Sequence, residues 1–199
     1  MNGRLRLWWR RSRRDDSAAQ IVEFAVALPL LMVFVVGIFD FSGAFTLKQK
    51  LTNAARDAAR TAAADPISDL SAALPMSVND AFYTIDTYLV ANKINDCGIT
   101  QSTSPSGLTW TSTSTGGGCP PGGLKIIINR GYYFPSTSTQ PAAPDCSVQA
   151  LGGQTAVLAT CVSIQYVYAW RFGSAASLLG RTASLPNPIA ATAVAMNEN

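Results

Sequence analysis

A strongly apolar stretch without a charged side chain lies near the N-terminus, between Glu23 and Asp40. A helix over its sixteen residues, FAVALPLLMVFVVGIF, would rise about 24 Å, which is short of the roughly 30 Å hydrocarbon core of a bilayer. Continuing the helix through Asp40 to Leu47 closes that gap. We therefore predict a transmembrane helix over residues 19–47, with the Asp40 carboxylate near the outer interface, where it reaches water or is protonated.

A second pattern follows directly, in the segment LKQKLTNAARDAARTAAA that ends at Ala64. Its leucines and alanines recur at the 3.6-residue period of an amphipathic helix. This indicates that the helix continues over residues 48–64 and presents a stripe of small side chains to another element. Pro66 is expected to end the helix, because the residue before a proline avoids helical geometry. The positions on the stripe are Leu47, Leu51, Ala54, Ala55, Ala58 and Ala62.

Residues 65–199 are predicted to form one small extracytoplasmic head domain. Apolar positions at helical spacing indicate a second helix over residues 77–92, with Ser77 as its N-cap. Residues 98–123 are rich in Ser, Thr, Gly and Pro and are interpreted as a surface loop with one short strand at 108–112. Three further strands are expected over residues 124–134, 155–172 and 189–196, with a bulge or bend in the second, which is long for one strand. The fold class is therefore α+β, a long N-terminal helix with a small antiparallel sheet covering the alanine stripe.

The distribution of charge predicts the orientation of the chain in the membrane. Six arginines stand against Asp15 and Asp16 in the first eighteen residues, a formal charge of +4, and basic flanks of a membrane helix stay in the cytoplasm. Residues 1–18 are thus predicted to be a cytoplasmic leader of a single-pass protein of the inner membrane. Removing them would leave nine of fifteen basic and ten of twelve acidic side chains, a net charge of −1. The basic character is a topology signal, and no nucleic-acid partner is indicated.

Four cysteines, Cys97, Cys119, Cys146 and Cys161, lie in the predicted extracytoplasmic part. An even number in an oxidising compartment favours disulfides, and three pairings are possible. Cys97 with Cys119 and Cys146 with Cys161 is the local choice, although spacing does not decide it. Zinc is not indicated, because the chain has no histidine and no CxxC pair.

The sequence contains no motif that indicates catalysis. Without histidine the commonest general base is absent. The segment GGGCPPGGLK before Ile126 lacks the glycine–lysine spacing of a phosphate-binding loop. We predict neither an enzyme nor a bound cofactor or metal.

Glu23 is unusual because it lies at the start of the apolar segment, where an ionised carboxylate costs several kcal/mol. One interpretation is that Glu23 marks the cytoplasmic border of the membrane and extends to water. The alternative is that it requires a cation, and a newly exposed α-amino group is the nearest candidate.

The residues around Glu23 resemble a known family. The run Ala18-Ala19-Gln20-Ile21-Val22-Glu23-Phe24, continued by GIFDFSGAF (residues 37–45) and NAARDAAR (residues 53–60), is similar to the processing and membrane segment of TadE-like proteins. These are minor pseudopilins of the tight-adherence (Tad) pilus system, and the match does not distinguish TadE from TadF. The resemblance implies cleavage by a prepilin peptidase between Ala18 and Ala19, which makes Glu23 the fifth mature residue. Here Ala18 replaces the usual glycine.

The resemblance also implies the partners: the prepilin peptidase, other pilins or pseudopilins, the pilus assembly platform and membrane lipid. Two other processing routes compete with this interpretation. The chain could remain an uncleaved membrane anchor with an extracytoplasmic binding domain. Alternatively, Ser42-Gly43-Ala44 fits ordinary signal peptidase, which would release a secreted domain after Ala44. A twin-arginine signal at Arg13-Arg14 is weak, because Asp15 and Asp16 follow where apolar residues are needed.

Overall fold

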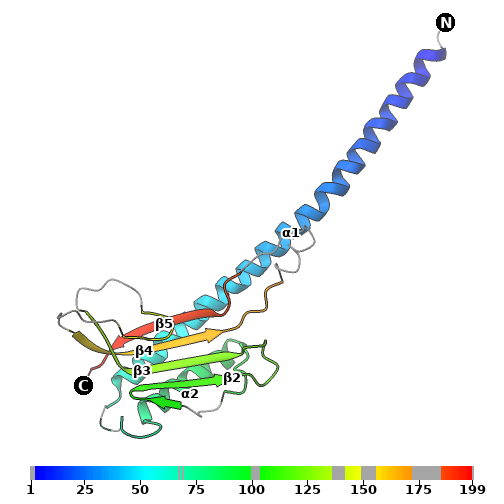
Figure 1. The fold of residues 1–199 in the computed structure, drawn as a ribbon. Helices are drawn as coiled ribbons and strands as arrows, with labels where there is room; N and C mark the ends of the chain where they lie inside the picture. The colour runs from blue at the N-terminus through cyan, green and yellow to red at the C-terminus, as the bar shows by residue number, and fades with distance from the viewer. Residues whose placement is uncertain are drawn as a thin grey trace. The chain divides into compact units, whose positions relative to one another are not determined.

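The computed structural model describes residues 3–66, 68, 70–99, 104–135, 142–148, 156–171 and 185–198, with side chains of the first helix from Ala18 onward. The described chain contains two helices, α1 (Gly3–Ala64) and α2 (Met76–Ala91), and five strands. All neighbouring strands pair antiparallel, in one sheet of order β1-β2-β3-β4-β5 (Figure 1). The predicted α+β class is confirmed. The strands are β1 (Ser104–Ser106), β2 (Thr109–Ser114), β3 (Leu124–Pro135), β4 (Ala156–Tyr166) and β5 (Ile189–Met196).

The chain divides into two compact units. The first comprises residues 1–42 and 170–185, and the second comprises residues 43–169 and 186–199. Each unit is described by itself below. Helix α1 contributes to both.

Helix α1 ends at Ala64, two residues before Pro66, as the sequence predicts. It starts at Gly3 and not at the expected Ala19. The residues between Arg4 and Ala18 include no glycine or proline that would interrupt it. The helix also continues through Pro29.

The predicted N-cap of α2, Ser77, is wrong: the N-cap lies two residues earlier and is a proline. The N-cap is Pro75, whose backbone is extended and which makes no side-chain capping bond. Ser77 lies inside the first turn, fully buried, and its hydroxyl has no hydrogen-bond partner among the described residues. Pro75 starts the helix because its fixed φ suits a helix start and its carbonyl accepts from the amides of Val78 and Asn79.

The segment predicted as a surface loop contributes two strands, β1 and β2, instead of the one short strand expected at residues 108–112. Trp110 on β2 is only 1% exposed, and its indole N–H donates to the carbonyl of Ala73 at 2.9 Å. Burial of this one large aromatic side chain therefore packs the Ser/Thr-rich segment against the core. Residues 100–103, in the same segment, lie outside the described residues.

The bulge lies on a different strand from the one predicted. The register between β3 and β4 shifts between Asn129 and Tyr132, where β3 carries one more residue than its partner. Strand β4 ends at Tyr166 and keeps a continuous register with β5. Gly131 lies in the bulge, and a Cβ there would come within 2.7 Å of Leu108 Cδ1, so the close approach favours glycine.

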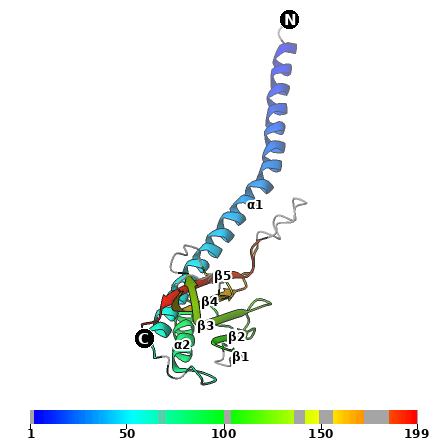
Figure 2. The same ribbon diagram turned by 60° about the vertical axis from the view of Figure 1, so that its left-hand side comes forward.

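Within the second unit, α2 and the C-terminal part of α1 cover one face of the sheet (Figure 2). The alanine stripe is buried from Leu51 to Ala63, and Leu47 at its start is half-buried. Alternate residues of β3 and β4 supply the large apolar side chains of this face. They are Leu124, Ile126, Ile128, Val162 and Ile164, all fully buried.

The opposite face of the sheet carries a smaller apolar cluster of Ile127, Tyr132, Cys146, Ala159 and Cys161. The segment 142–148 lies against it. Asn129 donates to the carbonyl of Cys146 at 3.0 Å, and Gln165 donates to the carbonyl of Pro144 at 2.8 Å. Both sheet faces are therefore at least partly covered by the second unit itself.

Candidate membrane and processing segment

The apolar part of α1 exposes nearly all of its side chains. Residues 18–64 contain a window of eighteen residues with mean hydropathy 2.6, of which 11% is buried, long and apolar enough to cross a bilayer. This marks α1 as a candidate membrane anchor. Its exposed large apolar side chains are Ile21, Val22, Phe24, Val26, Leu28, Leu30, Leu31, Met32, Phe34, Val35, Ile38, Phe39 and Phe41.

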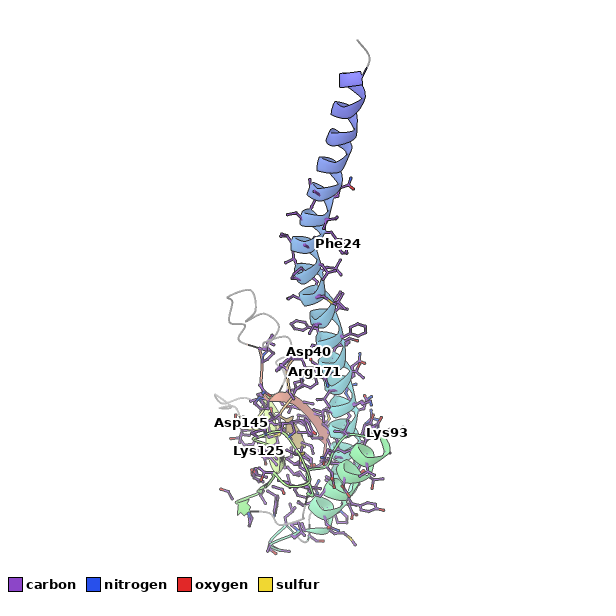
Figure 3. The ribbon with its side chains drawn as sticks, turned by 90° about the vertical axis from the view of Figure 1, so that its right-hand side faces the viewer. Phe24, Asp40, Lys93, Lys125, Asp145 and Arg171 are labelled. Atoms are coloured by element: carbon purple, nitrogen blue, oxygen red, sulfur yellow. A yellow bond between two sulfur atoms is a disulfide. The ribbon has the colours of Figure 1, made fainter. Side chains whose placement is uncertain are left out.

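The predicted processing residues Ala18, Ala19, Glu23 and Phe24 all lie on helical, exposed positions of α1. Ala19 and Glu23 are four residues apart, so they share one face of the helix. Phe24 is 66% exposed, and Figure 3 shows its position on the apolar part of the helix. The structure therefore brings these residues together on an accessible segment, and their role as a peptidase substrate stays a prediction.

At the other end of the apolar stretch, Asp40 is buried instead of open to water, with 6% of its surface exposed. Its Oδ2 accepts a hydrogen bond from the backbone amide of Arg171 at 2.7 Å (Figure 3). Next to it, the rings of Phe41 and Trp170 pack with centroids 5.4 Å apart and planes tilted by 59°. Sequence reasoning missed these contacts, because the partners are 131 residues apart in the case of Asp40 and Arg171.

In the second unit, the end of α1 is held by a cluster around Arg130, which we call the Arg130 cluster. Arg130 is 2% exposed, and its guanidinium donates to the carbonyls of Ala62 and Asp65, the latter at 3.0 Å. It also donates to Thr160 Oγ1 at 2.8 Å and to Asn197 Oδ1 at 3.4 Å. The last carbonyls of a helix have no partner within it. Arg130 therefore caps α1.

The two residues after β5, Asn197 and Glu198, contribute to the same end of α1. The amide of Glu198 donates to the carbonyl of Ala63 at 3.3 Å, and Thr160 donates to Asn197 Oδ1 at 2.6 Å. Earlier along the helix, Lys48 donates to the carbonyl of Ala190 on β5. These bonds fix β5 along residues 48–63 of α1, within the second unit.

The four cysteines form two disulfides, Cys97–Cys119 and Cys146–Cys161. These are the local pairs among the three possible pairings. Cys97–Cys119 links the segment after α2 to the turn before β3, and Asn95 in the same segment donates to the carbonyl of Gly117 at 2.6 Å. Cys146–Cys161 ties the 142–148 segment onto β4. Each disulfide therefore fastens an irregular segment to the sheet or its turns.

Two carboxyl groups lie near the first disulfide. Burial raises the pKa of Asp86 on α2, and the charge of Asp96 raises it further. Burial also raises the pKa of the Tyr166 hydroxyl, with a smaller contribution from Asp96. By contrast, hydrogen bonds from Ser147 lower the pKa of Asp145, and the charge of Lys125 adds to that effect. Asp145 and Lys125 are labelled in Figure 3.

No group of three or more His, Cys, Asp or Glu side chains that could hold a metal ion occurs among the described residues. Asp86 and Asp96 are a pair only. The feature of α1 that stands out is therefore an apolar stretch long enough to cross a bilayer.

Comparison with known proteins gives one match. The family model described as TadE-like protein matches residues 18–60, which cover the processing residues, the apolar stretch and most of the alanine stripe. No curated protein and no solved structure matches the chain. The family resemblance drawn from the sequence is thus confirmed for this segment: residues 18–60 are TadE-like, and they support a protein related to the Tad pilus.

Proposed function

We propose that this chain is a minor pseudopilin of a Tad-type adhesive pilus, anchored in the inner membrane by α1 and cleaved by a prepilin peptidase between Ala18 and Ala19. The observation that carries the proposal is Glu23, an exposed carboxylate at the start of an exposed apolar helix inside the TadE-like segment. A membrane anchor alone has no need of an acidic group at this position. A subunit that pairs with a neighbour does.

The apolar side chains of α1 explain how one helix serves before and after assembly. In the membrane, lipid chains surround side chains such as Phe34 and Ile38, which are 62% and 69% exposed. In a pilus, the same side chains would pack against the helices of neighbouring subunits. Apolar contact gives little preference between lipid and helix, so polar groups must help to select the assembled state.

Glu23 is the group that supplies this selection. Cleavage after Ala18 creates an α-amino group at Ala19, and Glu23 of one subunit would pair with the α-amino group of the next. Both charges leave water when the pair forms, and the cost of desolvation offsets much of their attraction. The pair therefore fixes the register of neighbouring helices more than it adds net stability.

The second unit fits an extracytoplasmic head. Disulfides persist in oxidising compartments, and both disulfides lie in this unit. The arginine-rich residues 1–18 would stay on the cytoplasmic side. Ala44 is 6% exposed inside the continuous helix α1, which favours retention of the helix over release of a secreted domain after Ala44.

The replacement of the family's glycine by Ala18 favours one competing function, an uncleaved membrane anchor with a binding head. N-terminal sequencing of the chain purified from membranes separates the two. We expect Ala19 as the first residue, and Ala18→Gly should raise the cleaved fraction. Met1 at the N-terminus would refute processing and support the anchor, and Phe45 would support the secreted form.

The role of Glu23 is tested by pilus assembly in cells that carry the complete Tad system. Glu23→Leu should leave membrane insertion intact and reduce the number of pili, while Glu23→Gln keeps the size of the side chain and should fail for loss of charge alone. Gln20→Leu is the matched control, because it adds the same apolar side chain one turn away and should assemble normally. Normal piliation with Glu23→Leu would overturn the pairing mechanism.

A further inference from the structure

Two segments far apart in the sequence meet where the apolar stretch of α1 ends. The carboxylate of Asp40 accepts the backbone amide of Arg171 at 2.7 Å, and the bond joins residues 131 positions apart. All of these residues lie in the first unit. Figure 3 labels Asp40 on α1 and, close to it, Arg171 of the segment after β4. The contact holds the segment that leaves β4 against α1.

This hydrogen bond accounts for the acid at position 40. A carboxylate at the end of a membrane-spanning stretch needs a donor, and the amide of Arg171 provides one that is fixed by the chain. Because the donor is a backbone group, the contact specifies where residues 170 and 171 lie without using the Arg171 side chain. The Arg171 side chain is exposed.

The side chains presented at this point have the chemistry of a membrane interface. Trp170 is half-buried and packs against Phe41, which is 49% exposed, with ring centroids 5.4 Å apart and ring planes tilted by 59°. Tryptophan is enriched at the level of the lipid headgroups, where its ring contacts acyl chains and its N–H reaches polar groups. A guanidinium beside it can bind headgroup phosphates in bidentate fashion.

The depth along the helix agrees with this chemistry. A hydrocarbon core of roughly 30 Å corresponds to about 20 helical residues. Counted from Ile21, about 20 residues reach Asp40, and counted from Phe24 they reach Gly43. Phe41 lies within one helical turn of the outer border in either case. Trp170 and Arg171, which contact the helix there, lie at the same level.

We propose that Phe41, Trp170 and Arg171 form a second lipid-binding surface, which takes the headgroup region of the phospholipid bilayer and is held on α1 by Asp40. The proposal rests on the membrane anchoring proposed above. It goes beyond that anchoring because the segment after β4, and not α1 alone, contacts lipid. Its consequence is a defined depth for α1, since the second lipid-binding surface resists movement of the helix into or out of the bilayer.

The test uses the full chain in phospholipid vesicles, with Trp8→Phe and Trp9→Phe so that Trp110 and Trp170 remain. Trp110 is 1% exposed in the second unit and serves as the internal reference. Fluorescence quenching is measured with phosphatidylcholine brominated either close to the headgroup or close to the end of the acyl chain. A parallel sample with Trp170→Phe reports Trp110 alone, and the difference gives the signal of Trp170.

We expect Trp170 to be quenched strongly by the shallow bromine and weakly by the deep one. Asp40→Ala, which removes the hydrogen-bond acceptor, should lose most of this quenching, whereas Asp40→Asn keeps an acceptor oxygen and should retain it. Quenching of Trp170 by aqueous iodide but not by brominated lipid would overturn the proposal. The proposal would also be overturned if neither quencher reached Trp170, since that result would indicate a protein partner over the second lipid-binding surface.

Extraction with alkaline carbonate distinguishes this failure from failure of the anchoring itself. A chain that stays with the membrane while Trp170 escapes the lipid quenchers refutes the second lipid-binding surface only. A chain that is released by carbonate refutes both the anchoring and the surface.

Discussion

Replacing Arg130 should destabilise the second unit more than any surface substitution, because this buried side chain caps the C-terminal end of α1. Its guanidinium bonds the carbonyls of Ala62 and Asp65, and also Thr160 and Asn197. Hydrogen bonds from a charged group contribute about 1.5–3 kcal/mol each, and desolvation of the buried charge offsets much of that sum. The net contribution therefore cannot be obtained by adding the bonds.

The cost of removing Arg130 is better defined. Arg130→Ala leaves the buried carbonyls of Ala62 and Asp65 without the donors that Arg130 supplies and opens a cavity at a position that is 2% exposed. A carbonyl that loses its donor in this way costs about 1–3 kcal/mol, so for the two carbonyls we expect the free energy of unfolding to fall by about 2–6 kcal/mol, with the cavity adding to the loss. Arg130→Lys keeps the charge but has no planar guanidinium to reach the same acceptors. Its free energy of unfolding should therefore lie between that of the unmodified chain and that of Arg130→Ala.

The measurement is urea unfolding of the full chain in detergent micelles, followed by the fluorescence of Trp110 with the other tryptophans replaced by phenylalanine. Arg60→Ala is the matched control, because Arg60 is exposed on α1 and should change the stability by less than about 0.5 kcal/mol. The reasoning about helix capping is refuted when Arg130→Ala unfolds within about 0.5 kcal/mol of the unmodified chain.

Two further predictions concern the second unit. The pKa of Asp86 is raised in the folded state by burial and by Asp96. Folding therefore favours the protonated form, and the stability that this form contributes is lost as the pH rises from the ordinary aspartate pKa of 3.8 through the raised folded pKa. Asp86→Asn should flatten the dependence of the urea midpoint on pH in that range, and an unchanged dependence would exclude Asp86 as its source. Cys146→Ser with Cys161→Ser opens a loop of sequence separation 15 and should lower the free energy of unfolding by about 3 kcal/mol, whereas an equal midpoint with and without the disulfide would contradict this.

The sequence was sufficient to predict the elements that depend on local periodicity. The alanines at 54, 55, 58 and 62 recur on one face of a helix, and all are buried. The strand at residues 189–196 was predicted with the bounds that the structure shows, because its β-branched residues and flanking prolines and asparagine mark both ends. The TadE-like segment was identified from residues on a single helix, and its family was confirmed.

What could not be predicted depends on partners distant in the sequence. Arg130 stands in an apolar strand, and nothing near it in the chain indicates that its guanidinium donates hydrogen bonds to carbonyls 65 and 68 residues away. Asp40 was expected at the outer interface, where it reaches water or is protonated. The hydrogen bond that it accepts could not be foreseen, because the donor is the amide of Arg171, in a segment without a membrane signal of its own. Trp110 lies among serines and threonines, so composition indicated a surface loop although one buried ring decides its position.

The change in side-chain size along α1 follows from two demands that no single composition can meet. Up to Phe41 the large apolar side chains are exposed, and only large side chains supply enough apolar area to hold a helix in lipid. From Ala44 onward the buried positions are mostly alanine, because a sheet can approach a helix closely only where the side chains between them are small. Gly43 stands at the change, where a Cβ would come within 2.6 Å of the Tyr168 hydroxyl. A leucine in place of one of the buried alanines, such as Ala55 or Ala58, would push the sheet away, and alanines in the apolar stretch would weaken insertion. The order of the two segments along α1 therefore determines which part is covered by the sheet and which part is left for lipid or for neighbouring subunits.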